Sequence, residues 1–172
     1  MPGIRVLADG RKKFSVLTIK PANVASPTAA ELNAGLDFSC KVLEEGFTFG
    51  ATDSEKVNEP ALCSTGNANA LGKSNYAVGF TMWRFFASSG TGFDSTDDAG
   101  FVAVRTKGTT LWAYLRQTDK LATTAWAAAD EIAFGAEFVT DLPQFQAGGG
   151  FTKYRIPGEV QFGFPFIAVA GV

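Results

Sequence analysis

Residues 131–142 (EIAFGAEFVTDL) decide the fold class, because apolar residues alternate along this stretch. Every second position from Ile132 to Phe138 is apolar and would point to one face of a strand, whereas Glu131 and Glu137 would point to the other. A period of two is typical of a β-strand with one buried face. We therefore expect a sheet with a hydrophobic core on one side of this strand.

Strand signals continue on both sides of this stretch. Residues 76–86 (YAVGFTMWRFF) are apolar at most positions, which predicts a strand covered on both faces, with Gly79 at a bulge or a close backbone approach. The 16 Phe and 19 Gly residues favour short strands over long amphipathic helices. The other predicted strands are residues 14–19, 36–43, 111–117, 151–156 and 159–169. The length of 172 residues predicts a single domain that spans the whole chain.

Helical signals are short. Pro27 suits the start of a helix, Thr28 and Glu31 have the spacing of a capping box, and Gly35 suits the helix end. Ser95 and Asp98 give a weaker capping signal ahead of a second helix at about 95–107. A helical turn is expected in the alanine-rich residues 123–130.

Residues 44–75 form the longest stretch without a clear period. A loop of this length is uncommon inside a compact domain and is usually functional. It contains Phe47, Phe49 and Leu62, which a purely solvated loop has no reason to keep. Two interpretations stay open: an interaction loop, or an irregular hairpin that folds back on its own domain.

The composition excludes several functions. The chain has 15 basic and 17 acidic residues, a net charge of −2, which is a poor balance for gripping DNA. It has no histidine, so His-based catalysis and His-ligated zinc are excluded. Cys40 and Cys63 are its only cysteines; we expect both to be reduced, with Cys40 packed on the apolar face of the strand at 36–43. We expect no signal peptide, no membrane span, no metal and no cofactor.

Two other function classes were weighed. Trp83, Trp112 and Trp126 would form the platform of a carbohydrate-binding β-sandwich. An acid-only glycosidase would need two carboxylates at a set separation. Its candidate residues are Asp53, Glu55, Asp94, Asp97, Asp98, Asp130, Glu131 and Asp141. Most of these acids lie where helix caps and solvated loops are expected, so the sequence predicts no enzyme.

Several segments resemble one known family. Residues 26–38 (SPTAAELNAGLDF) resemble the PT-x-x-EL-x-x-G-x-D stretch near the start of many tail tube (major tail) proteins of long-tailed, non-contractile bacteriophages. Residues 59–63 (EPALC) are similar to the long loop of these proteins, and residues 72–86 to their central strand. Residues 123–144 match an alanine-rich turn, an Asp, a strand and D-x-P, and residues 159–169 match the closing strand. Residues 88–100 depart from the family, which has a charged RD stretch there.

The resemblance implies a fold and a set of partners. The fold would be a β-sandwich or barrel-like domain with a short flanking helix and the long loop at about 44–75. Six copies would form a ring with a continuous β-barrel as its inner wall, and rings would stack into the tube through which DNA passes. Partners would be other copies, the tape-measure protein in the lumen, and the tail terminator and distal tail proteins. The protein would reside in the virion tail after assembly in the host cytoplasm. Tubes of contractile tails share the fold, so the tail type stays open.

Site residues follow from these expectations. On the strand faces opposite the core, Asp37, Ser39, Glu131 and Glu137 are candidates to line the lumen, and the alternative places these faces on the outer surface. The long loop would contact the neighbouring ring through Phe47, Phe49 and Leu62.

Overall fold

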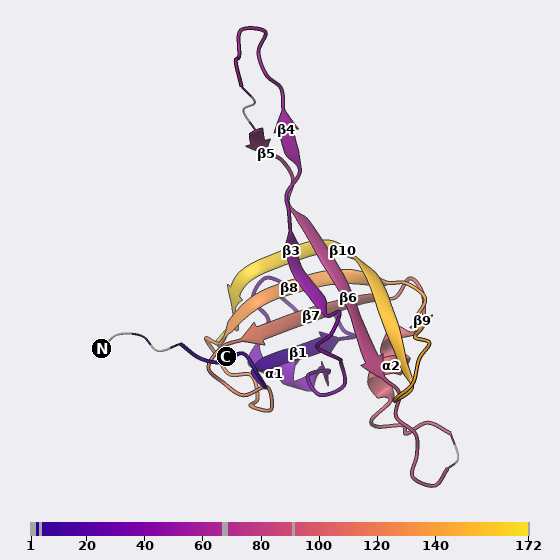
Figure 1. The fold of residues 1–172 in the computed structure, drawn as a ribbon. Coiled ribbons are helices and arrows are strands. Elements are labelled where there is room, and N and C mark those ends of the chain that lie inside the picture. The colour runs from indigo at the N-terminus through magenta and orange to yellow at the C-terminus, as the bar shows by residue number, and fades with distance from the viewer. Residues whose placement is uncertain (1–2, 4, 67–68, 91, 172) are drawn as a thin grey trace.

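The computed structural model describes residues 3, 5–66, 69–90 and 92–171 (Figure 1). The protein is mainly β, with 42% strand and 7% helix, as the sequence predicts. Its elements in chain order are β1 (Lys12–Leu17), α1 (Ala29–Ala34), β2 (Leu36–Asp37), β3 (Thr48–Thr52), β4 (Lys56–Asn58), β5 (Asn69–Leu71), β6 (Asn75–Trp83), α2 (Ala99–Val104), β7 (Thr110–Gln117), β8 (Glu131–Thr140), β9 (Gln144–Phe145) and β10 (Lys153–Ala168).

The main sheet is antiparallel and curls around one hydrophobic core. Its strand order is β2-β1-β7-β8-β10-β6-β3, and β9 pairs with β10. Phe14 of β1 and Phe49 of β3 come from nearly opposite ends of this order, yet their ring centroids lie 5.0 Å apart. Phe14 also contacts Phe80 of β6, and Phe49 contacts Phe134 of β8. The sheet is therefore bent into the sandwich-like, nearly closed form that was expected.

Strand β8 confirms the pattern that decided the fold class. Residues Ile132, Phe134, Ala136 and Phe138 are all buried, whereas Glu131 is exposed. The opposite face is only partly exposed to solvent. Helix α1 and residues 118–130 cover part of it and form a second, smaller apolar cluster there.

Helix α1 forms where its capping signals predict it. The Thr28 hydroxyl accepts a hydrogen bond from the Glu31 backbone N–H at 3.2 Å, and the Glu31 carboxylate accepts one from the Thr28 N–H at 2.8 Å. Leu32 points from this short helix into the smaller cluster. Helix α2 also exists, but it is shorter than predicted and begins after Asp98, whose side chain does not cap it.

The predicted strand at 36–43 is wrong beyond Asp37. The Asp37 carboxylate accepts hydrogen bonds from the Ser39 backbone N–H at 2.9 Å and from the Ser39 hydroxyl, which turns the chain. Phe38 then enters the core, and Ser39 accepts a bond from the Phe14 N–H. Cys40 is exposed as a result, so the expectation that it packs as a small hydrophobe is also wrong.

Four other expectations need correction. Residues 44–75 are not one loop: they hold β3, β4 and β5, and with β6 they form a long hairpin. Residues 123–130 contain turns and no helix. The two predicted closing strands are one continuous strand, β10, in which Pro157 pairs with Gly79 of β6. The bulge lies in β10 between Val160 and Phe162, not at Gly79.

The segment at 118–130 is irregular because a buried arginine binds its backbone. Arg116 is completely buried and donates hydrogen bonds to the carbonyl oxygens of Leu121, Thr124 and Ala125. It also pairs with the Asp130 carboxylate at 2.8 Å. These bonds give the carbonyl groups the partners that a helix would otherwise supply.

Candidate assembly surfaces

The most prominent surface is the hairpin that projects from the sheet (Figure 1). Its base is the β3–β6 ladder, in which Thr52 pairs with Asn75. Farther out, the Glu55 N–H donates to the Lys73 carbonyl, the Gly72 N–H donates to the Glu55 carbonyl, and β4 pairs with β5. The described residues of β4 and β5 are all exposed, so nothing in this chain covers the outer hairpin.

The three residues that the sequence assigns to ring stacking differ in their exposure to solvent. Phe49 is buried, and Phe47 contacts the Phe14 ring at a centroid distance of 5.1 Å. Both side chains therefore pack in the core of their own domain and anchor the hairpin there. Leu62 is fully exposed, at 108% of its reference area, and is the member of the set that is free to contact another chain.

The structure also divides the four candidates for the lumen. Glu131 is exposed at the start of β8, and Glu137 on the same strand accepts a hydrogen bond from the Trp112 indole N–H at 2.8 Å. Asp37 and Ser39 lie at the other side of the sheet, beyond β1 and β7. The four side chains therefore do not form one acidic surface within a subunit.

Asp37 has a role in its own fold. Its carboxylate pairs with the ammonium group of the buried Lys13 at 2.8 Å. Burial alone raises the pKa of Asp37, but the bonds from Lys13 and Ser39 outweigh burial and hold its pKa below the usual value. The negative charge of Asp37 thus balances the positive charge of the buried Lys13.

A second surface is the open edge of β10. This strand pairs with β6 from Lys153 to Gly158 and with β8 from Gly158 to Ala168. Among the described residues, no strand lies beside residues 159–168 on the side away from β8. After the bulge, the pairing register places Phe162 on the same face as Glu137. Phe162 and Phe166 are 61% and 79% exposed, so this open edge is also apolar.

A third surface is the uncovered outer face of β3, β6 and β10. The register places Thr48, Thr81 and Arg155 on this face. The Arg155 guanidinium lies across Gly79, where a Cβ atom would come within 3.3 Å of it. The close approach suspected at Gly79 is therefore a side chain crossing the strand. Two hydroxyl groups and one guanidinium group thus make this part of the face polar.

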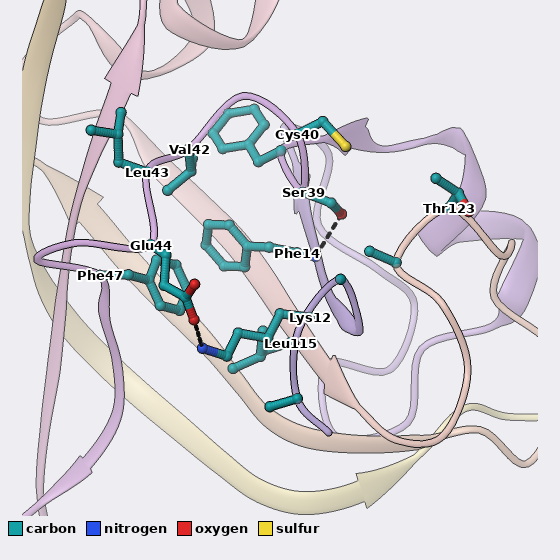
Figure 2. A pocket seen from close by; sticks show the side chains of 14 residues that line it. Lys12, Phe14, Ser39, Cys40, Val42, Leu43, Glu44, Phe47, Leu115 and Thr123 are labelled. Carbon is teal, nitrogen blue, oxygen red and sulfur yellow. Dashed lines mark hydrogen bonds and ion pairs between the residues drawn. The ribbon is translucent and has the colours of Figure 1, made fainter. Parts of the chain in front are cut away.

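A hollow of about 270 Å³ lies between the start of β1 and residues 38–47 (Figure 2). Phe14, Phe47 and Leu115 give it an apolar lining, and a Lys12–Glu44 ion pair spans one side. The Cys40 thiol lies at its edge, away from this pair, and no lining residue is positioned as its base. The hollow therefore resembles a packing defect, or a pocket for an apolar side chain, and not a catalytic centre.

The described residues do not form the sites that the alternative functions would need. Trp126 is buried and donates its indole N–H to Ser15, and Trp112 donates to Glu137, so the three tryptophans do not form a common exposed platform. In the part of the chain that the structure describes, no group of three or more His, Cys, Asp or Glu residues could hold a metal ion. Within the same residues, no helix is long and apolar enough to cross a membrane.

Several of the candidate catalytic acids form ion pairs within their own chain. Asp98 pairs with Arg84, Asp130 with Arg116 and Lys120, and Asp141 with Lys107. Burial by itself raises the pKa of Asp130, but the donors Lys120, the Ala127 N–H and Arg116 together lower it below the usual value. Hydrogen bonds from the Leu142 N–H and Lys107 likewise lower the pKa of Asp141, and a carboxyl with a lowered pKa does not suit a general acid.

A projecting hairpin, an open strand edge and exposed phenylalanines define a β-rich protein whose surfaces suit binding to other protein chains. A family model described as phage tail tube protein matches residues 1–170. The chain therefore belongs to the phage tail tube protein family, as its resemblance indicated, and is a structural component of a virion tail. A search of curated proteins found no match.

Proposed function

We propose that this protein is the repeating subunit of a phage tail tube, in which six copies form a ring and rings stack around a lumen that DNA crosses during ejection. Membership of the phage tail tube family carries the proposal. The tape-measure protein would occupy the lumen during assembly in the host cytoplasm, and the tail terminator and distal tail proteins would bind the two ends of the tube.

The open edge of β10 supports contact within a ring. An unpaired strand edge binds another strand through backbone hydrogen bonds, and exposed aromatic rings beside it add buried area. Strand β3 ends the sheet two strands beyond β10, so its outer edge at Thr48–Thr52 is also free within the described sheet. We place β10 of one copy against β3 of the next, which would continue the sheet around the ring and leave neither edge open.

The charge of the chain supports passage of DNA. A conduit must not bind phosphates tightly, and a net charge of −2 provides no strong attraction. Glu131 and Glu137 remain our candidates for the lumen wall. A map of the assembled tube that places both glutamates on the outer surface would refute this assignment.

The hairpin supports contact between rings. The Glu55–Gly72 and Glu55–Lys73 hydrogen bonds close it at a defined level. Replacing residues 56–71 by an Asn-Gly turn, which is a favoured two-residue hairpin connection, should leave the folded domain intact. Rings of this variant should not stack, because the residues proposed to contact the neighbouring ring have been removed. Circular dichroism and electron microscopy of this variant test the idea, and normal tubes would show that stacking lies elsewhere.

Negative-stain microscopy of the purified full-length protein tests the function itself. We expect rings or hollow tubes at high protein concentration. A strictly monomeric particle by light scattering, together with the absence of this protein from tubes of purified virions, would contradict the proposal.

A further inference from the structure

An aromatic surface lies at the end of β6 that is far from the hairpin. Its exposed members are Phe86, Phe93 and Phe145, at 55%, 52% and 66% exposure, and we call them the aromatic end surface. Phe86 and Phe93 stack with centroids 4.9 Å apart. Phe145 contacts Tyr154 at the start of β10, with centroids 5.7 Å apart.

A buried ion pair holds this surface in place. The Arg84 guanidinium lies 3.8 Å from the centre of the Phe93 ring and 3.8 Å from that of Phe101, so it is sandwiched between them. The Asp98 carboxylate, itself buried, accepts bonds from Arg84 Nε at 2.9 Å and Nη2 at 2.7 Å. Phe101 then contacts Tyr154 at 5.2 Å, which connects the two halves of the surface. The exposed rings are thus preorganised, which lowers the entropic cost of binding.

The hairpin and the aromatic end surface lie at opposite ends of β6, and we call the outer part of the hairpin, residues 56–66 and 69–71, the hairpin tip. β6 begins at Asn75, at the base of the hairpin, and ends at Trp83, one residue before Arg84 (Figure 1). This nine-residue strand places the base of the hairpin roughly 30 Å from the aromatic end surface, and the tip lies farther out. The tip is also apolar, because Val57, Leu62 and Leu71 are exposed.

The size of the aromatic end surface suggests a protein partner. With about 200 Å² per Phe ring, the three exposed fractions leave roughly 350 Å² of connected aromatic area. The largest apolar patch on a monomer is typically about 300–600 Å² and is often functional. Two different apolar surfaces at opposite ends of one subunit fit a head-to-tail contact, which repeats without closing and generates a filament.

The hairpin carries an excess of acids, whereas the aromatic end carries charges of both signs. In residues 53–66 the acids Asp53, Glu55 and Glu59 outnumber the single base Lys56, and none of these four takes part in the ion pairs found among the described residues. Lys153, which pairs in register with Trp83 at the aromatic end, has no ion-pair partner in the described chain either. Lys153 thus offers one basic partner for an acid of the hairpin, at an end of the domain that also carries Asp94 and Asp97.

We propose that the hairpin tip of one copy docks on the aromatic end surface of the next copy along the tube, with Leu62 packed against Phe86, Phe93 and Phe145. This inference rests on the proposed function and adds the acceptor site for the hairpin. It requires every copy to give its tip to one neighbour and to receive a tip from another.

Cysteine cross-linking tests the contact, because Cys63 already lies beside Leu62 and is exposed. Cys40 is first replaced by Ser, and Ser88→Cys or Ala147→Cys then places a thiol beside the aromatic end surface. A short bismaleimide should link tubes of these variants into a ladder of covalent oligomers on a denaturing gel. Gln161→Cys, on the open edge of β10, is the matched control, and the Cys40→Ser protein alone should give no ladder.

The outcomes separate the contact from the function. Tubes that form without a ladder at either position 88 or position 147 would overturn the docking site. Covalent dimers through Cys63 alone would show that tips meet tips and would also overturn it. If the parent protein forms no tubes at all, the proposed function fails, and this inference fails with it.

Substitution of the aromatic rings gives a second test. Phe86→Ser with Phe145→Ser should raise the protein concentration needed for stacking by about tenfold or more per ring. Circular dichroism should stay unchanged, because both rings are more than half exposed. Phe162→Ser, on the β10 edge, is the control and should impair ring closure, not stacking of preformed rings. Unchanged stacking by the double variant would refute the docking site.

Discussion

The buried pair of Arg84 and Asp98 offers a quantitative prediction for stability. Side-chain exposure is 8% for Arg84 and 1% for Asp98, and the carboxylate also accepts the Phe85 backbone N–H at 3.1 Å. Asp98→Ala leaves a buried guanidinium without its counter-ion. Removing one partner of a buried ion pair costs about 3–5 kcal/mol of unfolding free energy. In a domain of this length, that corresponds to a Tm lowered by roughly 6–20 °C.

Asp97 supplies the matched control on the neighbouring position. Its carboxylate is 61% exposed and lies 3.4 Å from the Lys41 ammonium group. An exposed pair of this kind contributes about 0–1 kcal/mol, so Asp97→Ala should change stability little. The side chain of Asp98 makes no capping bond to α2, so Asp98→Ala removes no helix cap. The contrast between two adjacent aspartates therefore isolates the effect of burial.

Equilibrium denaturation in guanidinium chloride measures both variants, with tryptophan fluorescence as the probe. The protein must be kept dilute and unassembled, because association adds apparent stability. The double variant Arg84→Met with Asp98→Leu should be less destabilised than Asp98→Ala, because it leaves no unpaired charge. A loss below about 1 kcal/mol for Asp98→Ala would refute the reasoning. So would equal effects of Asp98→Ala and Asp97→Ala.

Three further predictions concern packing, pH and the thiols. Gly135→Ala would bring a Cβ atom within 2.8 Å of the buried Tyr114 ring and should cost about 1–3 kcal/mol in thermal or chemical unfolding, whereas Gly50→Ala meets nothing within 4 Å and should not. Since hydrogen bonds hold the pKa of Asp130 below its usual 3.8, its contribution to stability should be complete above about pH 4 and decline as the pH falls through its lowered pKa; acid titrations of wild type and Asp130→Asn that run parallel would contradict this. Both cysteines are free and exposed, so alkylation without reductant should add two adducts by intact mass; a protein that takes up none would show a disulfide.

Local signals explain what the sequence predicted correctly. The Thr28–Glu31 capping box is completed within four residues, so it depends on nothing distant. The alternation in β8 is equally local, because a strand with one buried face must repeat every two residues. These features fixed the class of fold and the position of the first helix.

Competing polar contacts explain the errors. The alternation from Leu36 to Val42 suits a strand, but Asp37 and Ser39 form a turn that ends it. The alanine-rich residues 123–130 suit a helix, but Arg116, at the end of the preceding strand β7, binds the carbonyl groups of Thr124 and Ala125. In both cases the partner is near in sequence, but an alternation pattern does not show which polar side chain binds the backbone.

The assembly surfaces were hidden for a different physical reason. A sequence does not show whether a given phenylalanine is buried or exposed. Phe134 is buried and Phe145 is exposed because of where the bent sheet places each of them. The abundance of Phe was visible, but its division between core and surface was not. Phe49 was assigned to ring stacking for its apolar character, and that character is used in the core.

The hairpin shows why a missing period can itself carry information. Strand pairs in a monomer alternate because one face is covered, but β4 and β5 are exposed at every described position, so no alternation is selected by their own chain. The exposed apolar residues of this hairpin are the ones that a second copy would cover in the proposed stack. In the proposed stack, Val57, Leu62 and Leu71 would gain that cover from the aromatic end surface. The apolar residues of the hairpin, which one chain leaves exposed, would then be buried between two chains. Cross-linking of Cys63 to position 88 or 147 tests directly whether the two chains meet there.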